Sequence, residues 1–267
     1  MKNQVLCAVK KDLKEYMRNK KNLIFSFTVL FLCAMVFCST KLLPSLIDSL
    51  MKNASQMISN ADTIETTLIA FFPENLKANM GVLASDIAIF YGIVVILSTY
   101  NLIVKEIVGG KWIFPLSVGY NPFALILSKG LVYGIGAAFP TVVFYNLYYM
   151  VGSLYLYSDY SSSAALLNSL ALGFAMFSIV YITIMLAAIY KQPIMSAATM
   201  ILFVSVAPDI FTLFSFGKYL PTHILTYLYQ AENNYTELVI PVVGIIALAA
   251  LLTIIAVKKS EAIEVAR

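Results

Sequence analysis

Six long apolar segments constrain the fold of this chain more than any other feature. They cover residues 23–43, 83–104, 131–151, 164–190, 194–214 and 239–257. Each is long enough, as a helix, to cross about 30 Å of hydrocarbon at 1.5 Å per residue. Asp86 and Asp209 are their only acidic residues, and each lies near the outer end of its segment. The sequence therefore predicts an all-α membrane protein with six transmembrane helices.

The composition supports a membrane protein. Charged residues make up 12% of the 267 residues and hydrophobic residues 60%, whereas soluble domains are about a quarter charged. The three cysteines all lie in residues 7–38, and there is one histidine, so neither a disulfide framework nor a metal site is predicted.

Residues 1–22 predict an amphipathic helix that lies in the headgroup layer before the first span. One side would carry Leu6, Val9, Leu13, Tyr16 and Met17, and the other Lys10, Lys11, Lys14 and Arg18. A cleaved signal peptide is a less favoured alternative, because the basic region is too long and the apolar run that follows too extended.

The distribution of Lys and Arg predicts the orientation. Seven lie in residues 1–21, three in 105–129, one at position 191 and three after residue 257, which leaves four of the 18 for the other side. The more basic side is cytoplasmic. We therefore expect a multi-pass protein of a cell membrane, such as a bacterial plasma membrane, with both termini and residues 105–129 in the cytoplasm.

Two longer segments face outward in this arrangement. Residues 44–82 show helical periodicity in their first half, which predicts an amphipathic helix, a turn near Asn60 and a short helix broken by Pro73. This loop would either pack onto neighbouring spans or cap a cavity. Residues 215–238 carry few charges and predict a re-entrant segment. At the inner side, residues 191–193 predict a tight turn between the fourth and fifth spans.

The cytoplasmic segment 105–129 cannot itself span a membrane, because it contains three lysines, one glutamate and two prolines. We expect a short interfacial helix from Glu106 to Trp112, loosened by Gly109 and Gly110 and stopped by Pro115.

The order of residues in this segment resembles the permeases of ABC-2 type exporters. The resemblance lies in Glu106 at the end of the second span, glycines three and four residues later, the step from Phe114 to Ser117, and Lys129 at the start of the third span. Lys111 and Trp112 depart from the family pattern, which usually has a small or hydroxyl residue after the second glycine.

The resemblance implies an ABC-2 type exporter fold in which this segment is a coupling helix resting on a separate ATPase subunit, where ATP and Mg²⁺ bind. It also implies pairing with a second permease copy or a homologue. The candidate coupling residues are Lys105, Glu106, Gly109, Gly110, Trp112, Pro115 and Lys129. An ordinary cytoplasmic loop is the alternative interpretation.

No catalytic motif is present in the sequence. There is no phosphate-binding loop, zinc-protease motif or nucleophile elbow, so we expect no catalytic residue, metal or cofactor in this chain and no nucleic-acid partner. No acid, base or arginine row lies at mid-membrane, which argues against a proton-coupled carrier. Energy for uphill transport would have to come from another chain.

Two further sets of residues are candidates for a role in transport. Pro140 and Pro208 predict helix kinks. The aromatic residues of the third span either anchor it or line a substrate pathway; the candidates are Tyr133, Phe139, Phe144 and Tyr148. We expect export of an amphiphilic or peptide-like substrate, such as a peptide or a drug. A non-transporting scaffold or sensor subunit and an ATP-independent channel are the alternatives.

Overall fold

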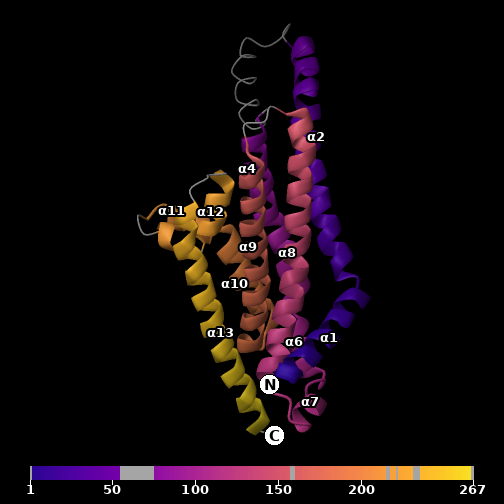
Figure 1. Ribbon diagram of the computed structural model, residues 1–267, viewed down its shortest axis with the longest axis vertical. Coiled ribbons are helices and arrows are strands. Elements are labelled where there is room, and N and C mark those ends of the chain that lie inside the picture. Colours follow the sequence, from indigo (N-terminus) through magenta and orange to yellow (C-terminus); the bar gives the residue numbers. More distant parts are fainter. Residues whose placement is uncertain are drawn as a thin grey trace.

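The computed structural model describes residues 2–54, 75–156, 160–214, 217–220, 222–230 and 235–265. These residues form helices and no strand. The long helices lie side by side in an elongated bundle (Figure 1). They are α1 (Lys2–Arg18), α2 (Lys21–Ala54), α4 (Leu76–Asp86), the π-helix η1 (Ile87–Tyr91), α5 (Gly92–Thr99), α6 (Leu102–Val108), α7 (Ile113–Ser117), α8 (Pro122–Tyr155), α9 (Ser162–Tyr190), α10 (Pro193–Ser205), α11 (Ala207–Thr212), the 3₁₀ turns η2 (Gly217–Tyr219) and η3 (Tyr235–Leu238), α12 (His223–Gln230) and α13 (Val239–Val265).

Five helical stretches of the described chain are long and apolar enough to cross a membrane. They are Lys21–Leu42, Leu76–Val108, Pro122–Tyr155, Ser162–Tyr190 and Tyr235–Ser260. The all-helical, multi-pass architecture predicted from the sequence is therefore confirmed.

The predicted span 194–214 is not one of the five, because the structure divides it into α10 and α11. The interruption lies at Val206, just before Pro208 in the first turn of α11. Proline has no N–H to donate to the carbonyl four residues earlier, so an unbroken helix is disfavoured there. At 1.5 Å per residue, the 13 residues of α10 extend about 20 Å, which is too short to cross a bilayer alone.

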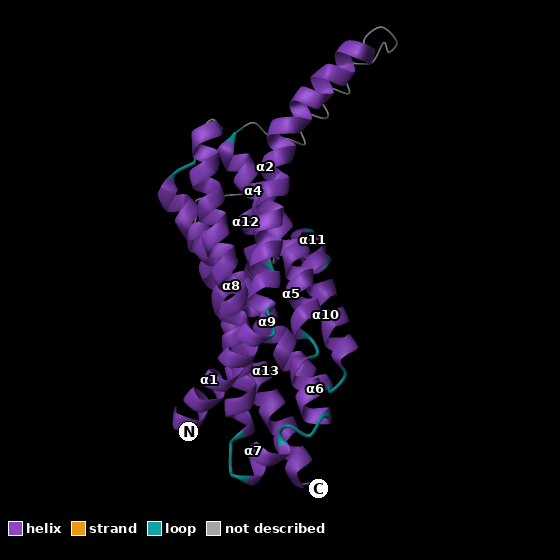
Figure 2. Cartoon of the chain, turned by 90° about the vertical axis from the view of Figure 1, so that its right-hand side faces the viewer, coloured by secondary structure: helices purple, strands orange, loops and turns teal. Residues whose placement is uncertain are grey.

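Both chain ends lie at the same end of the molecule, beside α7 (Figures 1 and 2). By the end of α13 the chain has returned to the end of the bundle at which α1 begins.

Several boundaries differ from those that the sequence predicts. The third long helix begins at Pro122 rather than near residue 131, so Lys129 lies inside α8 instead of opening it. That helix then runs without interruption through Pro140. α2 continues through Pro44 to Ala54 and takes in the start of the predicted outer loop (Figure 2). The predicted turn near Asn60 and the break at Pro73 lie outside the described residues.

The helices are buried to very different extents. α9 is central, because 83% of an apolar 18-residue stretch of this helix is buried. The corresponding buried shares in the stretches that contain α2 and α13 are 33% and 22%. α12 packs against α4 and α9 in the predicted re-entrant segment 215–238. α2 and α13 therefore expose apolar side chains to lipid or to another membrane protein.

Candidate functional site: a buried charge cluster and the segment beside it

Lys129 of α8 is the centre of a buried charge cluster. Its side chain is 2% exposed, and its Nζ lies 3.1 Å from Oδ1 of Asp12, 3.1 Å from Oε1 of Glu106 and 3.7 Å from Oε2 of Glu15. Asp12 and Glu15 belong to α1 and Glu106 to α6. One lysine thus joins three helices at the end of the bundle where both termini lie. We call Asp12, Glu15, Glu106 and Lys129 the Lys129 cluster.

Neighbouring side chains donate to the second carboxylate oxygens of Asp12 and Glu106. Ser128 donates a hydrogen bond to Oδ2 of Asp12, and Nε1 of Trp112 donates one to Oε2 of Glu106 at 3.0 Å. Nζ of Lys11 lies 3.5 Å from Oε1 of Glu106. A buried charge group of this kind is tolerated only when each member has a partner, and removal of one member leaves an uncompensated charge.

The carboxyl group of Asp12 on α1 is perturbed by its surroundings. Burial raises the pKa of its carboxyl group, and the nearby Lys129 ammonium and the Ser128 hydrogen bond only partly oppose this effect. Asp12 therefore binds a proton more readily in the folded chain than in solution.

Three carboxylates of the cluster lie close enough for metal binding, since oxygens of Asp12, Glu15 and Glu106 are within 4.8 Å of one another. Nζ of Lys129 lies within 3.7 Å of each of these side chains. The ammonium group supplies the positive charge that a metal ion would bring, so the arrangement is that of an ion-pair network.

The segment between α6 and α8 begins with a Schellman motif. Gly110 has a φ of 69°, its N–H donates to the Ile107 carbonyl at 3.2 Å, and the Lys111 N–H donates to the Glu106 carbonyl at 2.9 Å. This pattern ends a helix at a glycine in the left-handed conformation. The predicted helix from Glu106 to Trp112 is therefore wrong: α6 ends at Val108.

The short helix of this segment is α7, and Pro115 lies within it rather than stopping it. Pro115 occupies the first turn, where no N–H is needed for an intrahelical bond. A second Schellman motif ends α7, with Gly119 at a φ of 86° and hydrogen bonds at 2.9 Å from Gly119 to Leu116 and from Tyr120 to Pro115.

Further contacts fix the far end of the segment. The Asn121 side chain accepts a hydrogen bond from the Phe123 N–H and caps α8, and Pro122 follows in the first turn. Gln4 of α1 donates to the Gly119 carbonyl at 3.1 Å. Residues 109–121 are thus held at both ends, and α1 contributes to the contacts at each end.

The structure brings together only some of the predicted coupling residues. Glu106, Trp112 and Lys129 meet in or beside the cluster, but all three are buried and cannot contact another chain directly. Lys105 and Gly109 are exposed, whereas Gly110 and Pro115 are half-buried.

Four large apolar side chains are exposed in and directly before this segment, which was not predicted from the sequence. They are Val108 (80% exposed), Ile113 (55%), Phe114 (76%) and Val118 (63%). We call these four residues the apolar face of the segment. Their signal in the sequence was the presence of large apolar residues in a segment expected to face water.

The role of α1 in the site was also missed. Asp12 and Glu15 are the only acidic residues among the first 22. Asp12 lies four residues from both Ala8 and Tyr16, which are buried against the bundle. Acidic groups on the buried side of an amphipathic helix could have predicted a cationic partner on another helix.

The four candidate pathway aromatics do not surround one cavity. Tyr133 is fully buried; its ring lies 5.3 Å from that of Tyr16 and is 5.9 Å from Nζ of Lys129. Tyr148 is buried, Phe144 is partly buried and Phe139 is exposed. At about 3.6 residues per turn, Tyr133, Phe144 and Tyr148 lie on one side of α8 and Phe139 on another.

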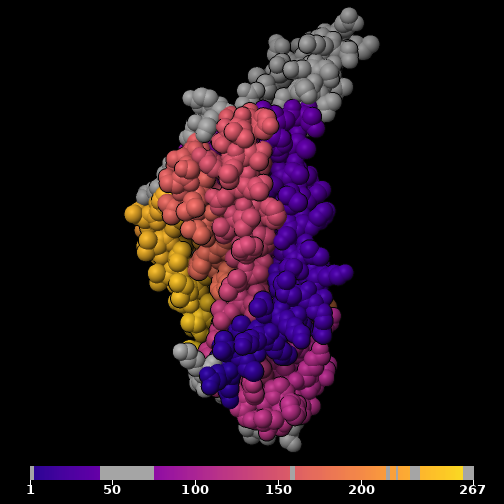
Figure 3. Space-filling model, turned by 45° about the vertical axis from the view of Figure 1, so that its right-hand side comes forward, coloured from indigo at the N-terminus to yellow at the C-terminus, as the bar shows by residue number. Residues whose placement is uncertain are grey.

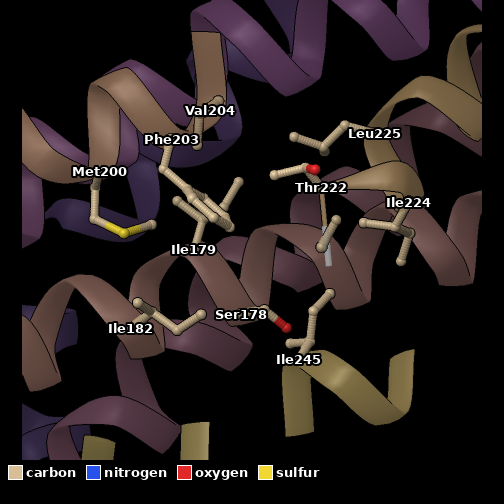
Figure 4. A pocket seen from close by; sticks show the side chains of 11 residues that line it. Ser178, Ile179, Ile182, Met200, Phe203, Val204, Thr222, Ile224, Leu225 and Ile245 are labelled. Atoms are coloured by element: carbon tan, nitrogen blue, oxygen red, sulfur yellow. The ribbon is translucent and has the colours of Figure 1, made fainter. Parts of the chain in front are cut away.

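A small cavity lies between α9, α10, α12 and α13 (Figure 4). Its volume is about 20 Å³, and its lining is apolar except for Ser178 and Thr222. This volume holds about one water molecule. It is far too small for a peptide or a drug, so it is not a passage for such a substrate.

No protein-family model, curated protein or solved structure matches this chain.

Proposed function

We propose that this chain is the transmembrane permease subunit of an ATP-binding cassette exporter, with an ABC-2 type fold. A separate ATPase subunit supplies the energy, and a second copy or a homologue completes the permease. The exported substrate is amphiphilic or peptide-like. The observation that carries the proposal is the segment at the end of the bundle, residues 109–121, which is held at both ends and, together with Val108 before it, exposes four large apolar side chains.

The geometry of the segment suits the transmission of movement. Two Schellman motifs fix its shape, and the Lys129 cluster joins it to α1 and α8. A force applied to α7 would therefore reach two other helices through close contacts rather than being absorbed by a flexible loop.

The apolar face supports a protein partner. The two most exposed members are Val108, the last residue of the stretch Leu76–Val108, and Phe114 of α7, and they lie on either side of the turn at Gly110 in the chain. Exposed apolar residues clustered on a polar end of a molecule are typical of an interaction site, and aromatic residues often dominate the binding energy there. Lys105 and Lys111, both exposed, add a cationic edge.

A pathway formed between two permease chains would require apolar contact surfaces on the outside of the bundle. α2 and α13 expose apolar side chains there.

The proposal is tested by purifying the tagged chain from its native membranes and measuring associated ATP hydrolysis. We expect a stoichiometric ATPase subunit. Replacement of Val108 and Phe114 by serine should lower the associated hydrolysis at least tenfold, since each buried apolar anchor contributes more than about 1 kcal/mol to binding. The matched control replaces Ile194 and Met195 by serine, because both are exposed apolar residues (75% and 53%) at the start of α10.

The possible results separate the candidate functions. Equal loss in both double variants would reject the apolar face as the docking site. Purification without an ATPase would favour a scaffold or sensor subunit. Substrate flux into vesicles that is independent of ATP would favour a channel.

A further inference from the structure

The helix α1 leaves part of its apolar surface uncovered. Ala8 and Tyr16 are buried against the bundle, but Leu6, Leu13 and Met17 are 58%, 50% and 56% exposed. Spacings of seven and four residues place these three on one side of the helix. The space-filling view shows α1 lying obliquely across the bundle below α2, with its outer surface free (Figure 3).

A row of cations borders this apolar stripe. Lys10, Lys14 and Arg18 recur every four residues, and all three are exposed. None of the three forms an ion pair with another described residue. Their charge is therefore available to an anionic partner.

An apolar groove follows immediately along the chain. Leu23, Ile24, Ser26, Phe27 and Leu30 of α2 line it together with Phe144 of α8. The groove is shallow, open to the side and about 540 Å³ in volume. Only Asn19 and Lys20 separate α1 from α2, so the groove begins about one helical turn after Arg18.

We propose that the junction of α1 and α2 binds an anionic phospholipid. The headgroup phosphate lies among Lys10, Lys14 and Arg18, and one acyl chain lies in the groove of α2. The three cations come before the start of the first span, and the groove lies along the beginning of that span. A phospholipid has its charged headgroup and its acyl chain in the same order. A zwitterionic lipid such as phosphatidylcholine would fill the groove equally well and has the same phosphate, but its choline group adds a positive charge beside the three cations and so offsets part of the attraction.

The bound lipid also bears on the position of α1. The opposite side of this helix carries Asp12, which is bound to Lys129. A lipid that holds α1 against the bundle therefore stabilises the Lys129 cluster. The lipid site itself does not depend on the proposed transport function.

The first test measures lipid retention by native mass spectrometry. The purified full-length chain is offered phosphatidylglycerol or phosphatidylcholine with identical acyl chains. We expect preferential retention of one phosphatidylglycerol. Lys14→Gln combined with Arg18→Gln should weaken its binding about 30-fold and change the retention of phosphatidylcholine much less, because each cation near an anionic headgroup contributes about fivefold.

The control removes two cations from the same end of the molecule. Lys191→Gln with Lys258→Gln changes the net charge equally, and both lysines are exposed. This control should retain phosphatidylglycerol like the parent. Equal retention of the two lipids by the parent, or equal loss in the two double variants, would overturn the proposal.

The second test locates the acyl chain. Phosphatidylglycerol with a photoreactive group on one acyl chain should label residues 21–30 of α2, and Ser26→Trp, which fills the groove, should abolish that label. Labelling that is unchanged by Ser26→Trp would contradict the assignment. Disulfide cross-linking of two copies through Phe27→Cys in membranes would assign the groove to a second copy and would equally contradict it.

Discussion

Replacing Lys129 by methionine tests the structural importance of the cluster. Methionine keeps much of the length of the side chain but leaves Asp12, Glu15 and Glu106 without their shared cation. Lys129 lies 3.1 Å from two carboxylate groups whose side chains are only 3% and 4% exposed. Removal of one partner from a buried ion pair costs about 3–5 kcal/mol. Because three carboxylates share this lysine, we expect a value near the upper end of that range.

The expected loss is large enough to measure by thermal unfolding in detergent. At roughly 2–4 °C per kcal/mol for a chain of this size, Lys129→Met should lower the Tm by on the order of 10 °C or more. Trp112 is the only tryptophan and donates a hydrogen bond to Glu106, so its fluorescence reports on the same cluster. The emission of the variant should shift to longer wavelength as the cluster opens to water.

Two controls make the result specific. Lys111→Met changes an exposed lysine in the same segment and should alter the free energy of unfolding by less than about 0.5 kcal/mol. Adding Glu106→Gln to Lys129→Met removes one uncompensated charge and should recover part of the lost stability. If Lys129→Met has the Tm and the tryptophan emission of the parent, the cluster does not stabilise the fold and our reasoning is refuted.

Three further predictions follow from the same region. Gly110→Ala should destabilise the chain by about 1–2 kcal/mol, because residue 110 has a φ of 69°. Gly92→Ala should destabilise it less, because the added Cβ atom meets only ordinary van der Waals contacts. Comparison of the Tm values of the two variants tests this difference. Burial raises the pKa of Asp12 in the folded state above its value in the unfolded state. Between these two pKa values the folded state binds more protons, so the free energy of unfolding should fall as pH rises through that interval. Asp12→Asn should lack this fall, and the same pH profile of stability in both proteins would contradict the prediction. Phe114→Ser should leave the Tm of the isolated chain within about 1 °C of the parent, because the side chain is 76% exposed, and a larger fall would show that Phe114 packs within the chain.

The helical membrane architecture was predictable because its signal is spread over many residues. A long apolar segment without charge has few structural alternatives in a bilayer. Residues 194–214 were predicted to form one continuous helix but form two. Pro208 lies in the first turn of the second helix and accounts for the interruption. Hydropathy averaged over the segment does not distinguish a continuous helix from one divided into two parts.

The segment after α6 shows why local structure was harder to predict. Gly109 and Gly110 were read as loosening a helix, yet Gly110 instead ends α6 through its left-handed conformation. The tertiary partner of Glu106, Lys129, is 23 residues away, and that of Lys129, Asp12, is 117 residues away. No local pattern indicates which of the charged residues near the membrane surface will meet, because such contacts depend on how the helices pack.

The most direct test of the account is site-specific photo-crosslinking in native membranes. A photoreactive amino acid is placed at position 114, in the apolar face of the segment, or at position 194, which is equally exposed at the start of α10. We predict that position 114 cross-links to one nucleotide-binding protein and that position 194 does not. Cross-links from position 114 to lipid alone would contradict the central claim that this segment receives an ATPase subunit.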